Sequence, residues 1–287
     1  MISENERPGT SVETHLAAYD HGELHDRYDR LATEEPLEIR MRAGGKRQTV
    51  AITMRTPGAD FELAAGFLFN EGVIHELREL QGISYCVDRE IDEAQRYNIV
   101  NVDLWSETLP ALDTLERHFL TTSACGVCGA ANIEALHARG LAPVPPGFGI
   151  EAATLAALPE RLSKAQRVFA ATGGLHAAAL FDARGELLAV REDVGRHNAL
   201  DKLIGWAFMQ KTLPLERHVV MVSGRASYEL VQKVISAGIP VLCAVSAPSS
   251  LAVELARDFG VTLIGFLRDE RFNVYAGAER LRTAGAA

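Results

Sequence analysis

Two cysteines spaced three residues apart are the side chains in this sequence best suited to covalent chemistry. Cys125 and Cys128 enclose Gly126 and Val127, and Gly129 follows, so the two thiols share a loop with backbone freedom. Thiols at this spacing can bind a metal ion together, can cycle between dithiol and disulfide, or can act as nucleophiles at sulfur. Other features of the sequence must decide between these chemistries.

Zinc binding and dithiol redox chemistry each lack a supporting feature. A structural zinc site needs a second close pair of Cys or His, but Cys86 and Cys243 are single and fall in predicted strands. A thioredoxin-like pair should follow the first strand of a βαβ unit, whereas this pair follows the polar run 121–123. A pair that merely fills a loop would leave exposed thiols without a role. We predict no bound metal, and zinc and redox chemistry stay as alternatives.

A sulfur nucleophile or carrier on a mobile loop fits the pair best. Such a thiol must ionise before it attacks the persulfide sulfur of a donor, and the positive end of a helix favours the thiolate. The helix predicted to begin near Ala130 supplies that end to Cys128 and, more weakly, to Cys125. The basic side chains in the immediate flank are Arg117 and His118, so further activation must come from elsewhere in the fold or from the donor protein.

Glycine and basic residues gather in loops of the second half that follow predicted strands. Anionic ligands of α/β proteins bind where the strands present their carboxyl ends, next to free N–H groups at helix starts. Each loop alone is more typical of helix capping, but together they favour a nucleotide-like ligand. The candidate residues are His176 after a Thr-Gly-Gly turn, Ser223, Gly224 and Arg225 after the strand 219–222, the loop 246–249, and Arg196 and His197 in the polar run 191–198.

Hydrophobic periodicity indicates two α/β parts. In the first, alternating apolar residues predict a hairpin over 37–54, a helix over 60–72 and strands near 83–87 and 98–104. In the second, strands alternate with helices, which predicts βαβ crossovers and a mainly parallel, buried sheet. These strands are predicted at 168–172, 178–181, 187–190, 219–222, 241–245 and 261–266, and the helices at 198–207, 228–237 and 250–259.

These patterns predict an α/β protein in four segments. Residues 1–30 are charged and lack apolar periodicity, so we expect a flexible tail. Residues 31–115 form a small α+β subdomain. Residues 116–149 hold the cysteine loop, a helix and a linker rich in Pro and Gly, and residues 150–287 form the larger α/β domain.

Composition limits the setting in which the protein can work. Its 287 residues are 47% apolar and 23% charged, which suits one large or two smaller globular domains. The net charge of −9, from 29 basic and 38 acidic residues, argues against nucleic-acid binding. No stretch reaches the roughly 18 apolar residues of a membrane span, and the start does not have the pattern of a signal peptide. We expect a soluble, cytoplasmic protein that binds neither nucleic acid nor membrane.

In combination, the motifs of this chain resemble the formate dehydrogenase accessory sulfurtransferase (FdhD) family. Each motif alone is common, but the combination is specific. The resemblance extends from about Pro36 to Tyr275 and leaves the first 30 residues outside. It is carried by Thr56-Pro57-Gly58, Glu62-Leu63-Ala64, Gly66-Phe67-Leu68, Glu71-Gly72-Val73-Ile74, Ser123-Ala124-Cys125-Gly126-Val127-Cys128-Gly129, Thr172-Gly173-Gly174-Leu175-His176, Arg191-Glu192-Asp193-Val194-Gly195-Arg196-His197-Asn198-Ala199 and Ser223-Gly224-Arg225.

The resemblance implies a function and a fold. Proteins of this family accept sulfur from a cysteine desulfurase as a cysteine persulfide. They pass it to the molybdenum cofactor, bis(molybdopterin guanine dinucleotide), before the cofactor enters formate dehydrogenase. The persulfide residue would be Cys125, with Cys128 as its partner. The larger domain would resemble the cytidine deaminase fold, and the protein would be a two-fold homodimer.

The resemblance also implies that the cofactor is bound transiently and that no cofactor is bound tightly. Guanine nucleotide would act as its mimic, one molecule at each protomer. Arg268 suits a phosphate or a guanine because its guanidinium donates several hydrogen bonds in one plane. The family's cofactor-binding segment would correspond to Leu263, Ile264, Gly265, Phe266, Leu267 and Arg268.

Two other classes of protein compete with a sulfur carrier. A zinc-dependent nucleobase deaminase would carry Pro-Cys-x-x-Cys, but Ala124 stands where that motif has proline. A chaperone would hold the molybdenum cofactor without moving sulfur, and Cys125→Ala would then leave its function intact. A sulfur carrier would lose its function with that substitution.

Overall fold

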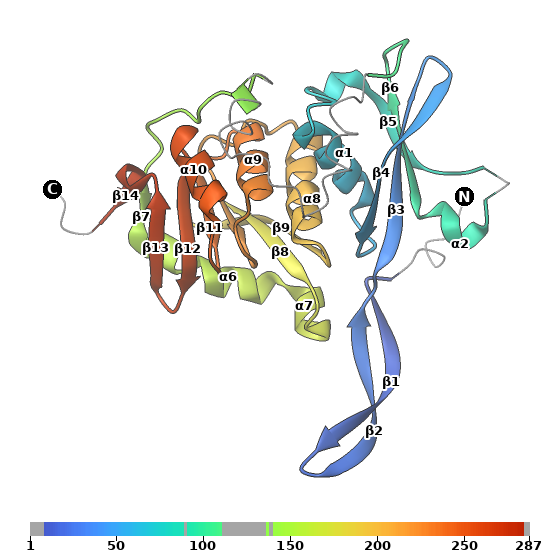
Figure 1. Cartoon of the computed structure of the whole chain (residues 1–287), viewed down its shortest axis with the longest axis horizontal. Coiled ribbons are helices and arrows are strands. Elements are labelled where there is room, and N and C mark those ends of the chain that lie inside the picture. Colours follow the sequence, from blue (N-terminus) through green and yellow to red (C-terminus); the bar gives the residue numbers. More distant parts are fainter. Residues whose placement is uncertain (1–8, 89–90, 111–135, 138–139, 284–287) are drawn as a thin grey trace.

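The computed structural model describes residues 9–88, 91–110, 136–137 and 140–283. Figure 1 shows three parts: a long β-hairpin arm, a small sheet with helices beside it, and a larger sheet with helices on both faces. The α/β class predicted from the sequence is confirmed. Among the described residues, no helix is long and apolar enough to cross a membrane.

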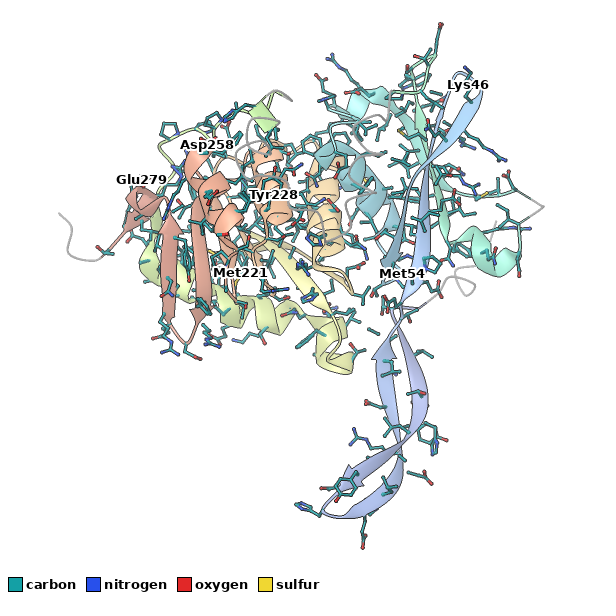
Figure 2. The ribbon with its side chains drawn as sticks, viewed as in Figure 1. Lys46, Met54, Met221, Tyr228, Asp258 and Glu279 are labelled. Atoms are coloured by element: carbon teal, nitrogen blue, oxygen red, sulfur yellow. The ribbon has the colours of Figure 1, made fainter. Side chains whose placement is uncertain are left out.

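The arm consists of β1 (Ser11–Asp20) and β2 (Glu23–Ala32), which pair antiparallel along their whole length. Residues that the sequence suggested lack regular structure thus form paired strands. His21 and Gly22 both adopt positive φ, 46° and 97°, as a two-residue type I′ hairpin turn requires. The side chains of the arm project into open space, which explains why the strands carry many charges and little apolar alternation (Figure 2).

The small sheet has the strand order β4-β3-β6-β5. The predicted hairpin is confirmed as β3 (Glu35–Ala43) and β4 (Lys46–Arg55), and the two later strands as β5 (Leu80–Tyr85) and β6 (Ile99–Leu104). The inward residues of β3 are fully buried, as their alternation predicts. The other elements of this part are the predicted helix α1 (Asp60–Asn70), the 3₁₀ turn η2 (Leu77–Glu79) and the short helix α2 (Glu93–Arg96).

Helix α1 joins the small sheet to the larger part by packing against α8 (Arg196–Met209). One side of α1 buries Leu63 and Leu68 in the core of the small sheet. On its other side, Gly66 meets Gly205 of α8, where a Cβ on either glycine would lie within 2 Å of a carbonyl oxygen of the opposite helix. The two helix backbones are therefore in direct contact, and this is why α1 is apolar nearly all round.

The larger sheet has the strand order β13-β12-β11-β10-β8-β9. The predicted parallel pairing holds for β10, β11 and β12, whereas β8, β9 and β13 pair antiparallel to their neighbours. The sheet is thus mixed. Its strands are β8 (His176–Phe181), β9 (Leu187–Asp193), β10 (Val219–Val222), β11 (Val241–Ala244), β12 (Thr262–Arg268) and β13 (Arg271–Ala276).

Helices cover both faces of this sheet (Figure 1). One face packs against α8, α9 (Tyr228–Ser236) and α10 (Ser250–Asp258). The other packs against α5 (Ala152–Ala156) and α6 (Leu158–Ala165). The remaining elements are the paired short strands β7 (Ile150–Glu151) and β14 (Leu281–Arg282) and the 3₁₀ turn η3 (Ala278–Arg280).

The strand predicted at 168–172 is wrong, because these residues form helix α7 (Arg167–Thr172). A short apolar run fits a buried strand and a helical turn equally well. Here the Thr172 hydroxyl donates to the Val168 carbonyl at 2.8 Å, and Gly173 ends the helix with a φ of 69°. The chain then enters the sheet at His176, so α7 stands at the sheet's edge instead of inside it.

Candidate functional site

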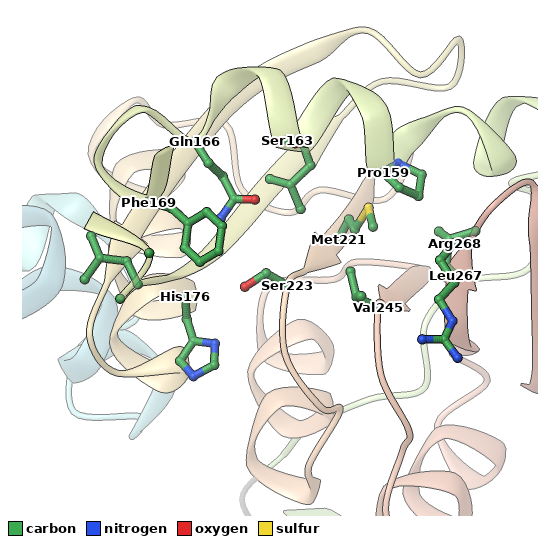
Figure 3. A pocket seen from close by; sticks show the side chains of 14 residues that line it. Pro159, Ser163, Gln166, Phe169, His176, Met221, Ser223, Val245, Leu267 and Arg268 are labelled. Atoms are coloured by element: carbon green, nitrogen blue, oxygen red, sulfur yellow. The ribbon is translucent and has the colours of Figure 1, made fainter. Parts of the chain in front are cut away.

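A cavity of about 560 Å³ opens at the edge of the larger sheet where β10, β11 and β12 present their carboxyl ends (Figure 3). Helices α6 and α7 form its other wall. Four of the residues predicted from the sequence line it: His176, Ser223, Leu267 and Arg268. The other lining residues are Pro159, Leu162, Ser163, Gln166, Phe169, Gly173, Gly174, Leu175, Met221 and Val245.

Hydrogen bonds between neighbouring loops hold this edge in place. The Ser223 N–H donates to the Ala177 carbonyl, and the Ala177 N–H donates to the Ser223 hydroxyl, both at 2.9 Å. The Ser246 N–H donates to the Gly224 carbonyl at 3.4 Å, and the Phe266 N–H donates to the Ser246 carbonyl at 3.2 Å. The start of β8, the loops after β10 and β11, and the end of β12 thus form one connected rim.

His176, Arg196 and Gly224 meet beside the cavity. A Cβ on Gly224 would lie 3.4 Å from His176 Nδ1 and 3.7 Å from Arg196 Cδ, so glycine lets the loop pass close to both side chains. Arg196 Nε is buried and has no hydrogen-bond partner among the described residues. A guanidinium N–H buried in this way lacks an acceptor, and an anionic ligand would supply one.

The pKa of His176 lies below its ordinary value because the ring is partly buried and because Arg196 and His197 place positive charge near it. At neutral pH the ring is therefore an uncharged imidazole that can both donate and accept a hydrogen bond. A bound anion would offset the positive neighbours and raise this pKa again.

The lowered pKa of His176 leads to a prediction about stability. Below about pH 6.5 the unfolded chain binds the proton more readily than the folded chain, so the protein loses stability as the pH falls through the folded-state pKa. His176→Asn should reduce the fall in the thermal unfolding midpoint between pH 7 and pH 5. His21→Asn, in the exposed turn of the arm, is the control and should leave the pH profile unchanged. Identical profiles for wild type and His176→Asn would contradict the prediction.

His197 lies beside α9 and is not among the residues that line the cavity. Its Nε2 is 3.2 Å from the Ser227 hydroxyl and 3.6 Å from a Glu229 carboxylate oxygen. The contact with His197 lowers the pKa of Glu229 to about 2. His197 therefore ties the start of α8 to the start of α9. Arg225 is exposed on the loop between β10 and α9.

The predicted segment 263–268 contributes its last two residues to the cavity. Leu263 and Ile264 are fully buried and pack into the two opposite cores of the sheet. Gly265 is packed so closely that a Cβ would lie 2.9 Å from both Pro248 and Tyr275. Leu267 and the exposed Arg268 line the cavity, since β12 ends there. When both faces of a strand are buried, only the residues at the end of the strand are accessible to a ligand.

The segment that carries Arg196 is fixed by a buried ion pair. Asp193 and Lys202 lie 2.7 Å apart and are almost completely shielded from solvent. Lys202 also donates to the Thr56 carbonyl at 2.8 Å. Asp193 accepts from the Thr56 N–H at 3.2 Å and from the Gly195 N–H at 2.8 Å. The motif that carries Arg196 and His197 is thereby attached to the loop that precedes α1.

Cys125 and Cys128 lie outside the described residues. The nearest described residue after them is Leu136, followed by His137, whose Nε2 lies 2.6 Å from an Asp258 carboxylate oxygen and whose ring stacks on Phe259. The two other cysteines, Cys86 and Cys243, are buried, and burial raises the pKa of the Cys243 thiol. Cys86 directly follows β5 of the small sheet and Cys243 lies in β11 of the larger sheet, so they do not lie together as a second cysteine pair.

The fold and the cavity define a two-part α/β protein with an open cavity at the carboxyl edge of its larger sheet. Residues 32–282 match the family model described as the FdhD/NarQ family, and the chain belongs to that family. The arm precedes the matched region almost entirely.

The chain is also similar to curated proteins named "Sulfur carrier protein FdhD". The protein of Streptomyces avermitilis is 55% identical and the alignment covers 93% of this chain and 94% of the relative. That of Mycobacterium tuberculosis is 51% identical over 89% and 92%, and that of Sulfurisphaera tokodaii 44% over 88% and 92%. A crystal structure of a putative formate dehydrogenase accessory protein from Desulfotalea psychrophila has the same fold. Its TM-score is 0.73 at 24% identity, with 95% of this chain and 100% of that chain covered.

Proposed function

We propose that this protein is a sulfur carrier that accepts sulfur from a cysteine desulfurase and transfers it to the molybdenum cofactor before insertion into formate dehydrogenase. The observation that carries the proposal is the 55% identity, over nearly the whole chain, to a protein named a sulfur carrier. The accessory role toward formate dehydrogenase is supported by the name of the structural neighbour. A cytoplasmic location and a two-fold homodimer belong to the same proposal.

The first step is a thiol exchange at sulfur. The thiolate of Cys125 attacks the terminal sulfur of the donor's persulfide and forms a new S–S bond. The donor's S–S bond breaks, and the donor cysteine leaves as a thiolate, so no external oxidant or reductant is consumed. Cys125 then carries the persulfide, and Cys128 is its partner on the same glycine-flanked loop.

The acceptor is the cofactor bis(molybdopterin guanine dinucleotide), which the protein binds transiently as its substrate. The cavity residues His176, Ser223 and Arg268 would contact it, with Arg196 beside them. Arg196 Nε, which has no partner in the part of the chain that the structure describes, and the positive charge of Arg268 fit the phosphates of such a ligand. Guanine nucleotide would be a suitable mimic, because it contains the same base and phosphate groups.

The experiment that tests the proposal follows one sulfur atom. The reduced protein is incubated with a cysteine desulfurase and free cysteine, and non-reducing mass spectrometry examines the peptide that contains Cys125 and Cys128. We expect one added sulfur that is absent from Cys125→Ala. Cys128→Ala measures whether the second thiol is needed for acceptance.

Two outcomes would contradict sulfur transfer. One is an unmodified peptide in the presence of an active desulfurase. The other is full formate dehydrogenase activity in cells that contain Cys125→Ala. Either result would favour the cofactor-binding chaperone, which the cavity also supports.

A further inference from the structure

The β-hairpin arm exposes large apolar side chains in an element that has no core. Tyr19 is 74% exposed, Leu24 71% and Tyr28 69%, and Val12 and Leu31 are exposed as well. Among the described residues the arm is a separate two-stranded sheet, so neither of its edges meets a third strand. A hairpin of two strands is at best marginally stable in water, and an open edge with apolar side chains favours pairing with another chain. The arm therefore has the properties of a surface that another chain covers.

The register of the arm determines which backbone groups are free. The Thr33 N–H donates to the Thr10 carbonyl at 3.0 Å, and along an antiparallel pair hydrogen-bonded residues alternate with residues that make no such bond. The odd-numbered residues of β2 therefore direct their N–H and C=O groups toward β1, and the even-numbered residues direct theirs outward. The Arg30 N–H agrees with this pattern, because it donates to the Asp29 carboxylate at 2.8 Å. The outward residues of β2 are Leu24, Asp26, Tyr28, Arg30 and Ala32.

The outer edge of β2 has a charge pattern that is complementary to itself. Its segment 26–30 reads Asp-Arg-Tyr-Asp-Arg. When two copies of this segment pair antiparallel about a two-fold axis at the central tyrosine, each Asp26 lies opposite the partner's Arg30. Each Arg27 then lies opposite the partner's Asp29. Opposite charges that face each other across two strands stabilise a sheet, and the two-fold symmetry forms each of these ion pairs twice.

Other registers of the same edge bring like charges together. An axis one residue away places Arg27 against the partner's Arg27, or Asp29 against the partner's Asp29. An axis two residues away does the same with Asp26 or with Arg30. The edge of β1 cannot form such ion pairs, because this strand has two acidic residues and neither Arg nor Lys. The charges therefore favour a single register, with the axis at Tyr28.

The same register covers apolar surface. His15 and Tyr28 lie opposite each other in the arm, and their ring centroids are 5.3 Å apart. Residues that lie opposite each other across strands share one face of the sheet, so an axis at Tyr28 places these rings of both copies in one row. Leu24 lies on the same face, four residues before Tyr28. The joined arms form four strands, which exceeds the three that a sheet needs for stability of its own.

We propose that the outer edge of β2 pairs with the same edge of a second copy of this chain, with the two-fold axis at Tyr28, in one antiparallel sheet of four strands. The inference rests on the homodimer of the proposed function, for which it names an interface, and it does not require sulfur transfer. The family model begins at residue 32, so this interface lies outside the region that the family model matches.

Sedimentation velocity of the full-length protein over a range of concentrations tests the edge. Tyr28→Pro removes the N–H at the axis and leaves the bonds between β1 and β2 intact, because this N–H points away from β1. We expect the dissociation constant of the dimer to rise at least tenfold. Ala17→Pro is the matched control, since Ala17 has the same outward position on the edge of β1, and it should leave the constant unchanged. An effect of Ala17→Pro as large as that of Tyr28→Pro would overturn the inference.

Charge reversal tests the register. Arg27→Asp alone and Asp29→Arg alone each place like charges opposite each other, so each variant should dimerise at least tenfold more weakly than wild type. In an equimolar mixture of the two variants, a mixed dimer has opposite charges at both places. We expect this mixed dimer to form with nearly the affinity of wild type, and native mass spectrometry separates it from the two homodimers by its mass. A variant that fails to fold could not give this recovery.

Three results would overturn the inference: a monomeric wild type, single variants that dimerise as tightly as wild type, or a mixture that forms no mixed dimer. The last result would also be expected if the arm bound another part of the second copy. Sulfur acceptance by wild type is measured separately. Its failure in a protein that dimerises through the arm would contradict the proposed function and leave the interface standing, whereas a monomer that accepts sulfur would overturn the interface alone.

Discussion

Lys202→Met is expected to lower the free energy of unfolding by about 3 to 5 kcal/mol, because it leaves the Asp193 carboxylate buried without its cation. Asp193 is fully buried and lies 2.7 Å from Lys202 Nζ. Methionine keeps most of the volume of lysine but supplies neither the charge nor the bond to the Thr56 carbonyl. The backbone N–H donors of Thr56 and Gly195 remain, yet they do not neutralise the charge.

Denaturant unfolding of wild type and variant measures this difference. Lys164→Met is the matched control, since Lys164 pairs with Glu160 at 2.6 Å on the exposed face of α6, and it should leave the free energy of unfolding close to that of wild type. Removing both charges in Lys202→Met, Asp193→Leu should restore part of the stability, because no buried charge is then left unpaired. A loss below about 1 kcal/mol for Lys202→Met alone would show that water or another cation reaches Asp193.

Lys202→Met should also loosen the segment that carries Arg196 beside the cavity. Asp193 and Lys202 attach the start of α8 to the loop before α1, and Arg196 and His197 follow Asp193 directly. The polar motif 191–198, which the sequence suggested as a cavity wall, thus has a second role as the attachment between the two parts of the molecule. Asp193 serves the attachment, because it is buried and paired with Lys202. Arg196 serves the cavity wall, and its Nε has no partner among the described residues.

Elements with strong apolar periodicity were predictable from the sequence. The strands at 219–222 and 241–245 and the helices at 228–237 and 250–259 appear at or within a few residues of the predicted bounds. The prediction failed for the arm and for α7, where the apolar pattern is weak or covers only a few residues. The arm has few inward residues to alternate because it is exposed on both faces, and α7 is a single apolar run too short to separate helix from strand.

The cavity was predictable in part, for a physical reason. Ser223 and Arg268 stand at the carboxyl ends of parallel strands, which an α/β sheet brings together at one edge. His176 reaches the same edge for another reason, because it begins the antiparallel strand β8. Gln166 and Phe169 come from helices that lie across this edge, and no local pattern indicates which side of a short helix faces a cavity. The buried glycine contact between α1 and α8 was also invisible, because a close approach between helices 130 to 140 residues apart depends on tertiary packing.

Gly205→Ala is expected to destabilise the protein by about 2 to 3 kcal/mol, although alanine is the better helix former by about 1 kcal/mol. The new Cβ would lie 1.8 Å from the Glu62 carbonyl oxygen and 2.7 Å from the Gly66 backbone nitrogen. Both are main-chain atoms of α1, so no side chain can turn aside. The helices must separate, and the buried hydrogen bond that Asn70 of α1 donates to Asp201 of α8 at 2.7 Å would lengthen.

Gly82→Ala is the matched control, because a Cβ at Gly82 meets no atom within 4 Å and its φ is not positive. The free energies of unfolding of the two variants and wild type, measured in denaturant, should place Gly82→Ala near wild type and Gly205→Ala well below it. Equal stability of Gly205→Ala and wild type would mean that α1 and α8 can move apart without loss. The glycine contact would then not be needed to join the two parts. The polar bonds from Asp193 and Lys202 to Thr56, and from Asn198 to Met54, would suffice to hold the start of α8 in place.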